Sequence, residues 1–159
     1  MAAVDYFLKL DGIDGESTAA GHEKWIEIES YSWGVTNSGA HDTSGAGAGK
    51  AVPSDFTLTL PFSSASPQMF NKCVTGGSFD FVQIDATKAQ QGKATTYLTY
   101  KLSDVLISAL STEGGGDAPM EQVSFAFAKV EVNYTPQSAD GSLVTPIRGA
   151  FDFRLIKLF

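Results

Sequence analysis

The sequence is poor in the residues that build metal centres and covalent cross-links. It has one cysteine, Cys73, and two histidines, His22 and His41, among 159 residues. One cysteine cannot form an intrachain disulfide, and no Cys/His set has the spacing of a zinc site. The chain therefore has to fold by packing alone, which fits a reducing compartment. We expect no metal and no cofactor, and we expect both histidines to be solvated loop residues.

Long apolar runs are also lacking. No run approaches the roughly 20 apolar residues that cross a bilayer, and the N-terminus has neither the basic region nor the apolar core of a secretory signal. We expect no membrane insertion. We expect the chain to be made and assembled in the cytoplasm and, where it is secreted, to leave by a leaderless route.

Positive charge is scarce as well. There are 11 Lys and Arg against 18 Asp and Glu, a formal net charge of −7. Most faces of such a molecule repel a nucleic-acid backbone or an anionic membrane surface, so nucleic acid is not expected as a partner. Self-association of such acidic subunits has to use locally complementary charges or apolar patches.

Short runs with β periodicity, separated by Gly, Asp and Ser clusters, dominate what is present. The clearest is 56–62, where apolar residues alternate with Thr57 and Thr59. Other strands are expected at 4–10, 25–35, 78–85, 95–102, 105–110, 123–134 and 149–158. We predict one domain of residues 1–159 with an all-β dominated fold, a two-sheet sandwich or barrel. The run 25–35 changes phase, which predicts a bulge or a change of sheet near Ser30.

One segment predicts a helix, at about 67–75, packed on the open side of the barrel. Helical spacing there places four apolar side chains on one face: Met69, Phe70, Cys73 and Val74. Ser66 is expected to cap the first turn, Pro67 to occupy a position where its missing N–H costs nothing, and Gly76 to end the helix in a left-handed conformation. Cys73 is expected to be a buried, unreactive thiol.

A segment at about 37–54 has almost no large apolar side chain and is much longer than the usual loop of roughly 4–6 residues. Its residues 45–50 suggest a phosphate loop, but the pattern G-x-x-x-x-G-K-[ST] would need Gly at Ser44 and a hydroxyl at Ala51. Residues 11–16 suggest a calcium loop, but Ile13 and His22 stand where oxygen ligands are required. We find no nucleophile elbow and predict no catalytic residues, although a triad assembled from distant loops stays open.

Several blocks, in order along nearly the whole chain, resemble one family. Residues 6–17 contain an aromatic-aliphatic strand and the turn G-I-D-G-E-S, residues 32–34 give S-W-G before the Gly-rich loop, and residues 123–142 run V-S-F-A-F-A-K-V-E-V-N-Y-T-P-Q-S-A-D-G-S. These blocks resemble the hemolysin-coregulated protein (Hcp) family of bacterial type VI secretion systems. Two places depart from its pattern, namely 60–62 and the more apolar end at 149–159.

The resemblance implies a two-sheet β-barrel with a helix on one side, assembled as hexameric rings that stack into a tube. It implies a tube built in the cytoplasm inside a contractile sheath, capped by a VgrG-type spike protein, exported, and able to carry effectors in its lumen. It implies no enzyme activity. On this basis we expect strand edges and apolar residues to make the ring.

We also expect the long loop to contact neighbouring subunits or rings, through Ser38, Gly39, His41, Asp42, Gly45, Gly47, Gly49 and Lys50. The alternative function is a secreted β-barrel binding module or a hydrolase without a recognisable motif, because an all-β fold can host either.

Overall fold

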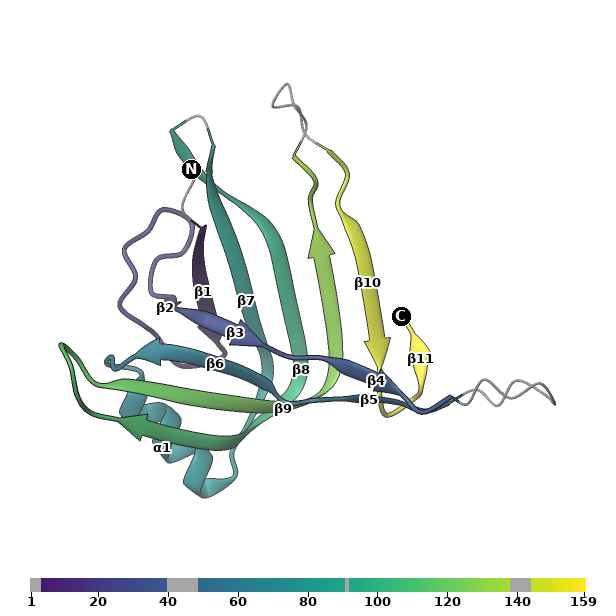
Figure 1. The fold of residues 1–159 in the computed structure, drawn as a ribbon, viewed down its shortest axis with the longest axis horizontal. Coiled ribbons are helices and arrows are strands. Elements are labelled where there is room, and N and C mark those ends of the chain that lie inside the picture. The colour runs from purple at the N-terminus through teal and green to yellow at the C-terminus, as the bar shows by residue number, and fades with distance from the viewer. Residues whose placement is uncertain (1–3, 40–48, 91, 138–143) are drawn as a thin grey trace.

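The computed structural model describes residues 4–39, 49–90, 92–137 and 144–159 (Figure 1). The elements are β1 (Val4–Leu10), β2 (Ile26–Ile28), β3 (Ser30–Ser32), β4 (Val35–Asn37), β5 (Ala51–Pro53), β6 (Phe56–Pro61), α1 (Ser66–Thr75), β7 (Ser78–Gln90), β8 (Lys93–Glu113), β9 (Met120–Tyr134), β10 (Ile147–Asp152) and β11 (Lys157–Leu158). The β-dominated fold with one helix confirms the predicted fold class.

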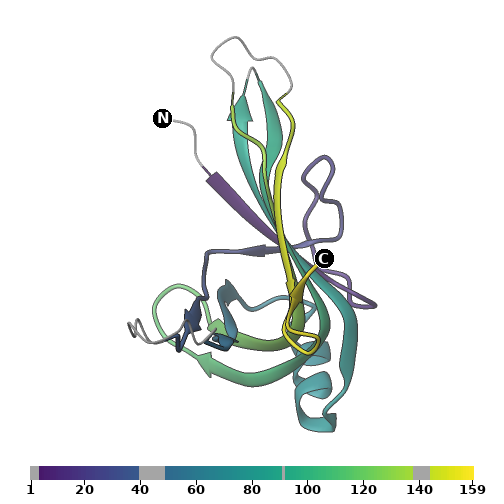
Figure 2. The same cartoon turned by 90° about the vertical axis from the view of Figure 1, so that its right-hand side faces the viewer.

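Nine of these strands form one antiparallel hydrogen-bonded network. Its main path is β11-β10-β9-β8-β7-β1-β2, and β6 joins it by pairing with β9 on one side and β3 on the other. The long strands β8 and β9 serve two layers, because one half of β9 pairs with β10 and the other half pairs with β6. Figure 2 shows β8 and β9 leaving the upright layer and curling beneath it. The two predicted sheets are therefore two layers that share strands.

The bend lies inside β8, where the sequence predicted two separate strands. Asp104 adopts a left-handed conformation at φ 54°, and the register with β9 shifts between Ile107 and Ala109. A strand can turn sharply at such a point without ending. The opposite error occurs at 149–158, which was predicted as one strand and forms two, β10 and β11, joined by a turn.

The chain changes layers at the predicted place. β2 pairs with β1, while β3 pairs with β6, and the Glu29 N–H donates to the Thr59 carbonyl between them. The phase change seen in 25–35 is this change of partner. Large buried side chains from both layers fill the space between them: Leu8, Phe56, Leu58, Phe79, Leu102 and Phe125.

Helix α1 lies where it was predicted, but two details of that prediction are wrong. Ala65 occupies the N-cap position, and the Ser66 hydroxyl makes no capping bond; it donates to Glu121 Oε1 at 2.6 Å. Only Met69 of the predicted apolar face is fully buried, whereas Phe70 and Val74 are exposed. Cys73 is half-buried rather than buried. The helix end matches the prediction, since Gly76 is left-handed at φ 68°.

The predicted loop at 37–54 begins and ends in regular structure. β4 and β5 pair with each other in a separate two-stranded sheet, with Thr36 opposite Val52. The prediction of loop at 51–53 is therefore wrong. Figure 1 shows this ribbon, which we call the β4–β5 arm, projecting to the right of the two layers.

Candidate functional site

Four of the eight predicted contact residues lie together at the outer end of the β4–β5 arm, between β4 and β5 and the residues outside the described ranges. The Ser38 N–H donates to the Lys50 carbonyl at 3.4 Å, and the Lys50 N–H donates to the Ser38 hydroxyl at 3.3 Å. A Cβ on Gly49 would lie 1.9 Å from the Gly39 nitrogen, so only glycine allows the two chains to approach this closely. The other four, His41, Asp42, Gly45 and Gly47, lie outside the described residues.

The arm offers a surface without an apolar core of its own. Val35 and Val52 expose about half of their side chains, and the backbone at its base is held by hydrogen bonds instead of burial. A short exposed ribbon of this kind can pair with or insert against another chain. Its chemistry suits contact with a protein surface and not catalysis.

Apolar side chains also gather at the C-terminal end, which the sequence singled out only as a departure from the family pattern. Four exposed residues lie there: Leu155, Ile156, Leu158 and Phe159. Phe159 lies close to the Lys129 ammonium and the Arg148 guanidinium on the adjoining sheet surface. Exposed apolar clusters of this kind mark interaction surfaces.

A hollow of about 510 Å³ opens beside β3 and is largely aromatic. Its lining is Tyr6, Glu29, Ser30, Tyr31, Ser32, Trp33 and Tyr100. Burial, together with the 3.0 Å hydrogen bond that joins the Tyr31 and Tyr100 hydroxyls, raises the pKa of Tyr31 well above its usual range. The phenol is thus neutral at physiological pH, so the hollow offers stacking and hydrogen bonds to a ligand instead of an activated base.

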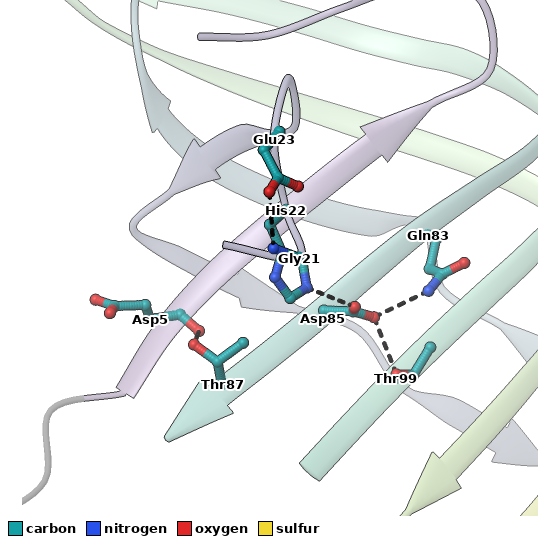
Figure 3. Close-up of polar contacts among 8 residues, drawn as sticks. All are labelled: Asp5, Gly21, His22, Glu23, Gln83, Asp85, Thr87 and Thr99. Carbon is teal, nitrogen blue, oxygen red and sulfur yellow. Dashed lines mark hydrogen bonds and ion pairs between the residues drawn. The ribbon is translucent and has the colours of Figure 1, made fainter. Parts of the chain in front are cut away.

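His22 is not the solvated loop residue that the sequence predicted. Figure 3 shows its ring directed at Asp85 on β7. Nε2 of His22 lies 2.8 Å from Oδ2 of Asp85, and the two residues are 7% and 5% exposed. Because an ionised carboxylate only accepts hydrogen bonds, Nε2 carries the proton in this pair. The ring also stacks on Phe7 and meets the edge of Trp25.

Among the residues that the structure describes, this His–Asp pair forms no nucleophilic triad. The nearby Thr99 hydroxyl donates to Asp85 Oδ1 at 2.9 Å and Gln83 donates to the same oxygen, so both bind the carboxylate and not the imidazole. Activation of a hydroxyl requires it to face the imidazole. The cluster instead ties the 11–25 segment to β7 and β8. Its partners lie 63 residues apart, which explains why no local pattern revealed it.

A second buried carboxyl, Glu121 on β9, joins the helix to the sheet. It accepts the Ser66 hydrogen bond on Oε1, while Oε2 has no partner among the described residues. Burial raises the pKa of Glu121. No group of three or more His, Cys, Asp or Glu residues that could hold a metal ion occurs in the part of the chain that the structure describes. Within that same part, no helix has the length and apolarity needed to cross a membrane.

Comparisons with known proteins point to one family. The family model described as "Type VI secretion system effector, Hcp" matches residues 7–134. Protein hcp1 of Pseudomonas aeruginosa is 36% identical over 143 residues, covering 88% of each chain.

Solved structures agree with this match. A structure described as a type six secretion system protein has a TM-score of 0.90 and 30% identity, and covers 99% of this chain and 100% of its own. Hcp1 from Salmonella typhimurium has a TM-score of 0.81 and 30% identity, with 100% of both chains covered. The chain therefore belongs to the Hcp family of type VI secretion tube proteins.

Proposed function

We propose that this protein forms closed rings of six subunits that stack into the type VI secretion tube, and that the tube lumen carries effectors. The observation that carries the proposal is the family match over residues 7–134, together with a full-length structural match to Hcp1 from Salmonella typhimurium. The tube is assembled in the cytoplasm and exported by the type VI system. Its partners are copies of itself, a VgrG-type spike protein, the contractile sheath and secreted effectors.

The surface of the subunit supports assembly through local patches. At a net charge of −7, copies repel one another at long range. The exposed apolar side chains at the C-terminal end and on the β4–β5 arm provide the short-range attraction that can overcome this repulsion. Exposure of such patches to water is unfavourable, so they favour association of the subunits.

The mass of the particle tests the ring. Light scattering or native mass measurement should give roughly six times 16.9 kDa. A mass of one or two subunits at high concentration would refute the ring. It would favour the alternative, a secreted β-barrel binding module or a hydrolase, which a screen for substrate turnover would then separate.

Within the tube, the β4–β5 arm and its loop contact neighbouring subunits or rings. Its predicted contact residues are Ser38, Gly39, His41, Asp42, Gly45, Gly47, Gly49 and Lys50. Deletion of residues 39–49 should leave a folded ring that stacks poorly, as seen by electron microscopy of tubes. A Gly/Ser replacement of the same length separates the need for these side chains from the need for length. Tubes that form equally well after the deletion would show that the arm has no such role.

We further propose that residues 1–159 fold as a single domain. Strands from both ends of the chain, β1 and β11, belong to one hydrogen-bonded network, which supports this. Unfolding in urea should then show one transition with the same midpoint for tryptophan fluorescence and for far-ultraviolet circular dichroism. Two separated transitions at constant particle mass would contradict a single domain.

A further inference from the structure

We propose that the turn at the C-terminal end of one subunit inserts into an acidic groove at the opposite end of a second copy. The inserting element, which we call the C-terminal knob, consists of residues 154–158. The receiving element, the Glu16 groove, lies between residues 16–18, β2 and the end of β6. The inference rests on the proposed ring, for which it names the contact between neighbouring subunits.

The knob has a backbone conformation that side chains of its type avoid. Ile156 lies in the left-handed region at φ 56°, which for a β-branched residue is a strained outlier. Its side chain is nevertheless 60% exposed, so no packing within the subunit compensates for the strain. Leu155 and Leu158 are exposed beside it. An apolar, strained and exposed turn is best explained by a contact outside the subunit.

The knob is also held in a fixed shape before any partner arrives. The buried Asp152 carboxylate accepts the backbone N–H groups of Arg154 at 2.9 Å and Leu155 at 3.0 Å. The two hydrogen bonds lower the pKa of Asp152, the Leu155 N–H contributing most. A preformed turn loses little conformational entropy on binding.

The Glu16 groove has the size and chemistry to receive this turn. It encloses about 160 Å³ and is lined by Glu16, Ser17, Thr18, Ile26, Glu27, Pro61, Phe62 and Ser63. That volume is below the roughly 300–1,000 Å³ of pockets for small organic ligands, and it suits a branched aliphatic side chain. Phe62 offers apolar surface, since the residue is 46% exposed.

The charges of the two elements are complementary. The knob carries Arg154 and Lys157, whereas the groove carries Glu16 and Glu27, so each acidic rim can meet a basic turn. Glu16 is held in place by the Ser64 N–H at 3.2 Å. The chain has a net charge of −7, so a basic turn with apolar side chains is expected to bind an acidic surface that also exposes apolar side chains. The Glu16 groove of another copy has both properties.

The position of the two elements favours a ring. Figure 1 shows β11 at the right of the molecule and the end of β6 at the left. A contact between two different patches is heterologous, and it generates a closed ring when the rotation between subunits closes.

Charge reversal on each side tests the contact. One variant carries Arg154→Glu and Lys157→Glu, and the other carries Glu16→Lys and Glu27→Lys. Each alone juxtaposes like charges, and should raise the concentration at half-assembly by at least about tenfold. Mixed in equal amounts they restore opposite charges at every contact, so native mass measurement should show rings with alternating subunits, three of each kind.

The control matched to the Arg154/Lys157 variant is Lys88→Glu with Lys93→Glu, which makes the same change in net charge at the far end of the β7–β8 hairpin and should assemble nearly as wild type. If either reversed variant forms rings as readily as this control, the contact is wrong. It is also wrong if both variants are folded but their mixture stays unassembled, or if rings form and only their stacking is lost. A monomeric wild type would refute the proposed ring itself.

A second variant pair isolates the apolar part of the contact. Ile156→Asn removes the apolar side chain and relieves the strain, because asparagine tolerates the left-handed region. Val74→Asn on α1 removes a side chain of nearly equal exposure, 63% against 60%, outside both elements. The first variant should weaken ring assembly without lowering the melting temperature of the subunit, and the second should leave assembly unchanged. Equal assembly of the two variants would overturn the role of Ile156.

Discussion

Replacing Asp85 with alanine removes the acceptor shared by His22, Gln83 and Thr99. The His22 bond is buried and involves a charged acceptor, so it contributes about 1.5–3 kcal/mol, and the Thr99 and Gln83 bonds contribute about 1 kcal/mol each at most. Alanine also leaves the His22 N–H buried without a partner. We expect the free energy of unfolding to fall by about 3–5 kcal/mol.

That loss corresponds to a fall in melting temperature of about 6–20 °C, since 1 kcal/mol shifts the midpoint of a chain of this size by about 2–4 °C. Thr99→Val serves as the control within the same cluster, because it removes one hydroxyl and leaves the pair intact. It should cost about 1 kcal/mol. All variants are compared at one protein concentration, because assembly adds a concentration-dependent contribution to stability.

A double-mutant cycle with His22→Ala and Asp85→Ala separates the pair from its surroundings. The double variant should be less destabilised than the sum of the two single variants, by about 1.5–3 kcal/mol, because the second change removes a group already left unpaired by the first. Amide hydrogen exchange in residues 14–25 should rise more than in β8 for each single variant. A coupling below about 0.5 kcal/mol would refute the reasoning that the pair fastens this segment.

Three further outcomes are expected. Burial raises the pKa of Glu121 above its ordinary value of 4.5, so the folded protein binds this proton more tightly than the unfolded chain does. The contribution of Glu121 to the free energy of unfolding therefore falls as the pH rises from 4.5 through the raised pKa. Glu121→Gln should flatten that fall in urea titrations across the range from about pH 4 to pH 8. Met69→Ala should lower the free energy of unfolding by about 2–5 kcal/mol, because Met69 is the fully buried apolar side chain of α1. Val74→Ala, at an exposed position, should lower it by no more than about 0.5 kcal/mol in thermal unfolding. Gly49→Ala should separate the two chains at the outer end of the arm, seen as faster amide exchange at Ser38 and Lys50, and leave the unfolding midpoint within about 2 °C.

The sequence predicted strands well where one face of a strand is buried. In β6 the buried residues Phe56, Leu58 and Leu60 recur with the period of two that a half-buried strand requires. The arm strands β4 and β5 gave no such pattern, because they bury little and are held by backbone hydrogen bonds. The continuity of β8 was also missed, since its bend depends on the left-handed conformation of Asp104 and not on a glycine.

The polar contacts and the contact surfaces were harder to predict than the fold, because both depend on residues that only the folded chain brings together. His22 sits among polar residues, and only the folded chain shows that Asp85 meets it from another strand. The four described loop residues, Ser38, Gly39, Gly49 and Lys50, do lie together as their placement at the two ends of one loop implies. The resemblance of whole blocks to the Hcp family carried the functional prediction, because surface complementarity leaves no compact motif in a sequence.

One ion pair links Asp104, whose backbone is left-handed at the bend of β8, to the knob that contains the left-handed Ile156. Arg154 of the C-terminal knob binds the Asp104 carboxylate at the bend of β8, and both side chains are half exposed or more. A pair this exposed contributes only about 0–1 kcal/mol to stability. Arg154 can therefore exchange Asp104 for an acidic side chain of a neighbouring copy at little cost. The pair orders the guanidinium before assembly, so little side-chain entropy is lost when the knob docks. Because the pair is weak, breaking it opposes docking only slightly.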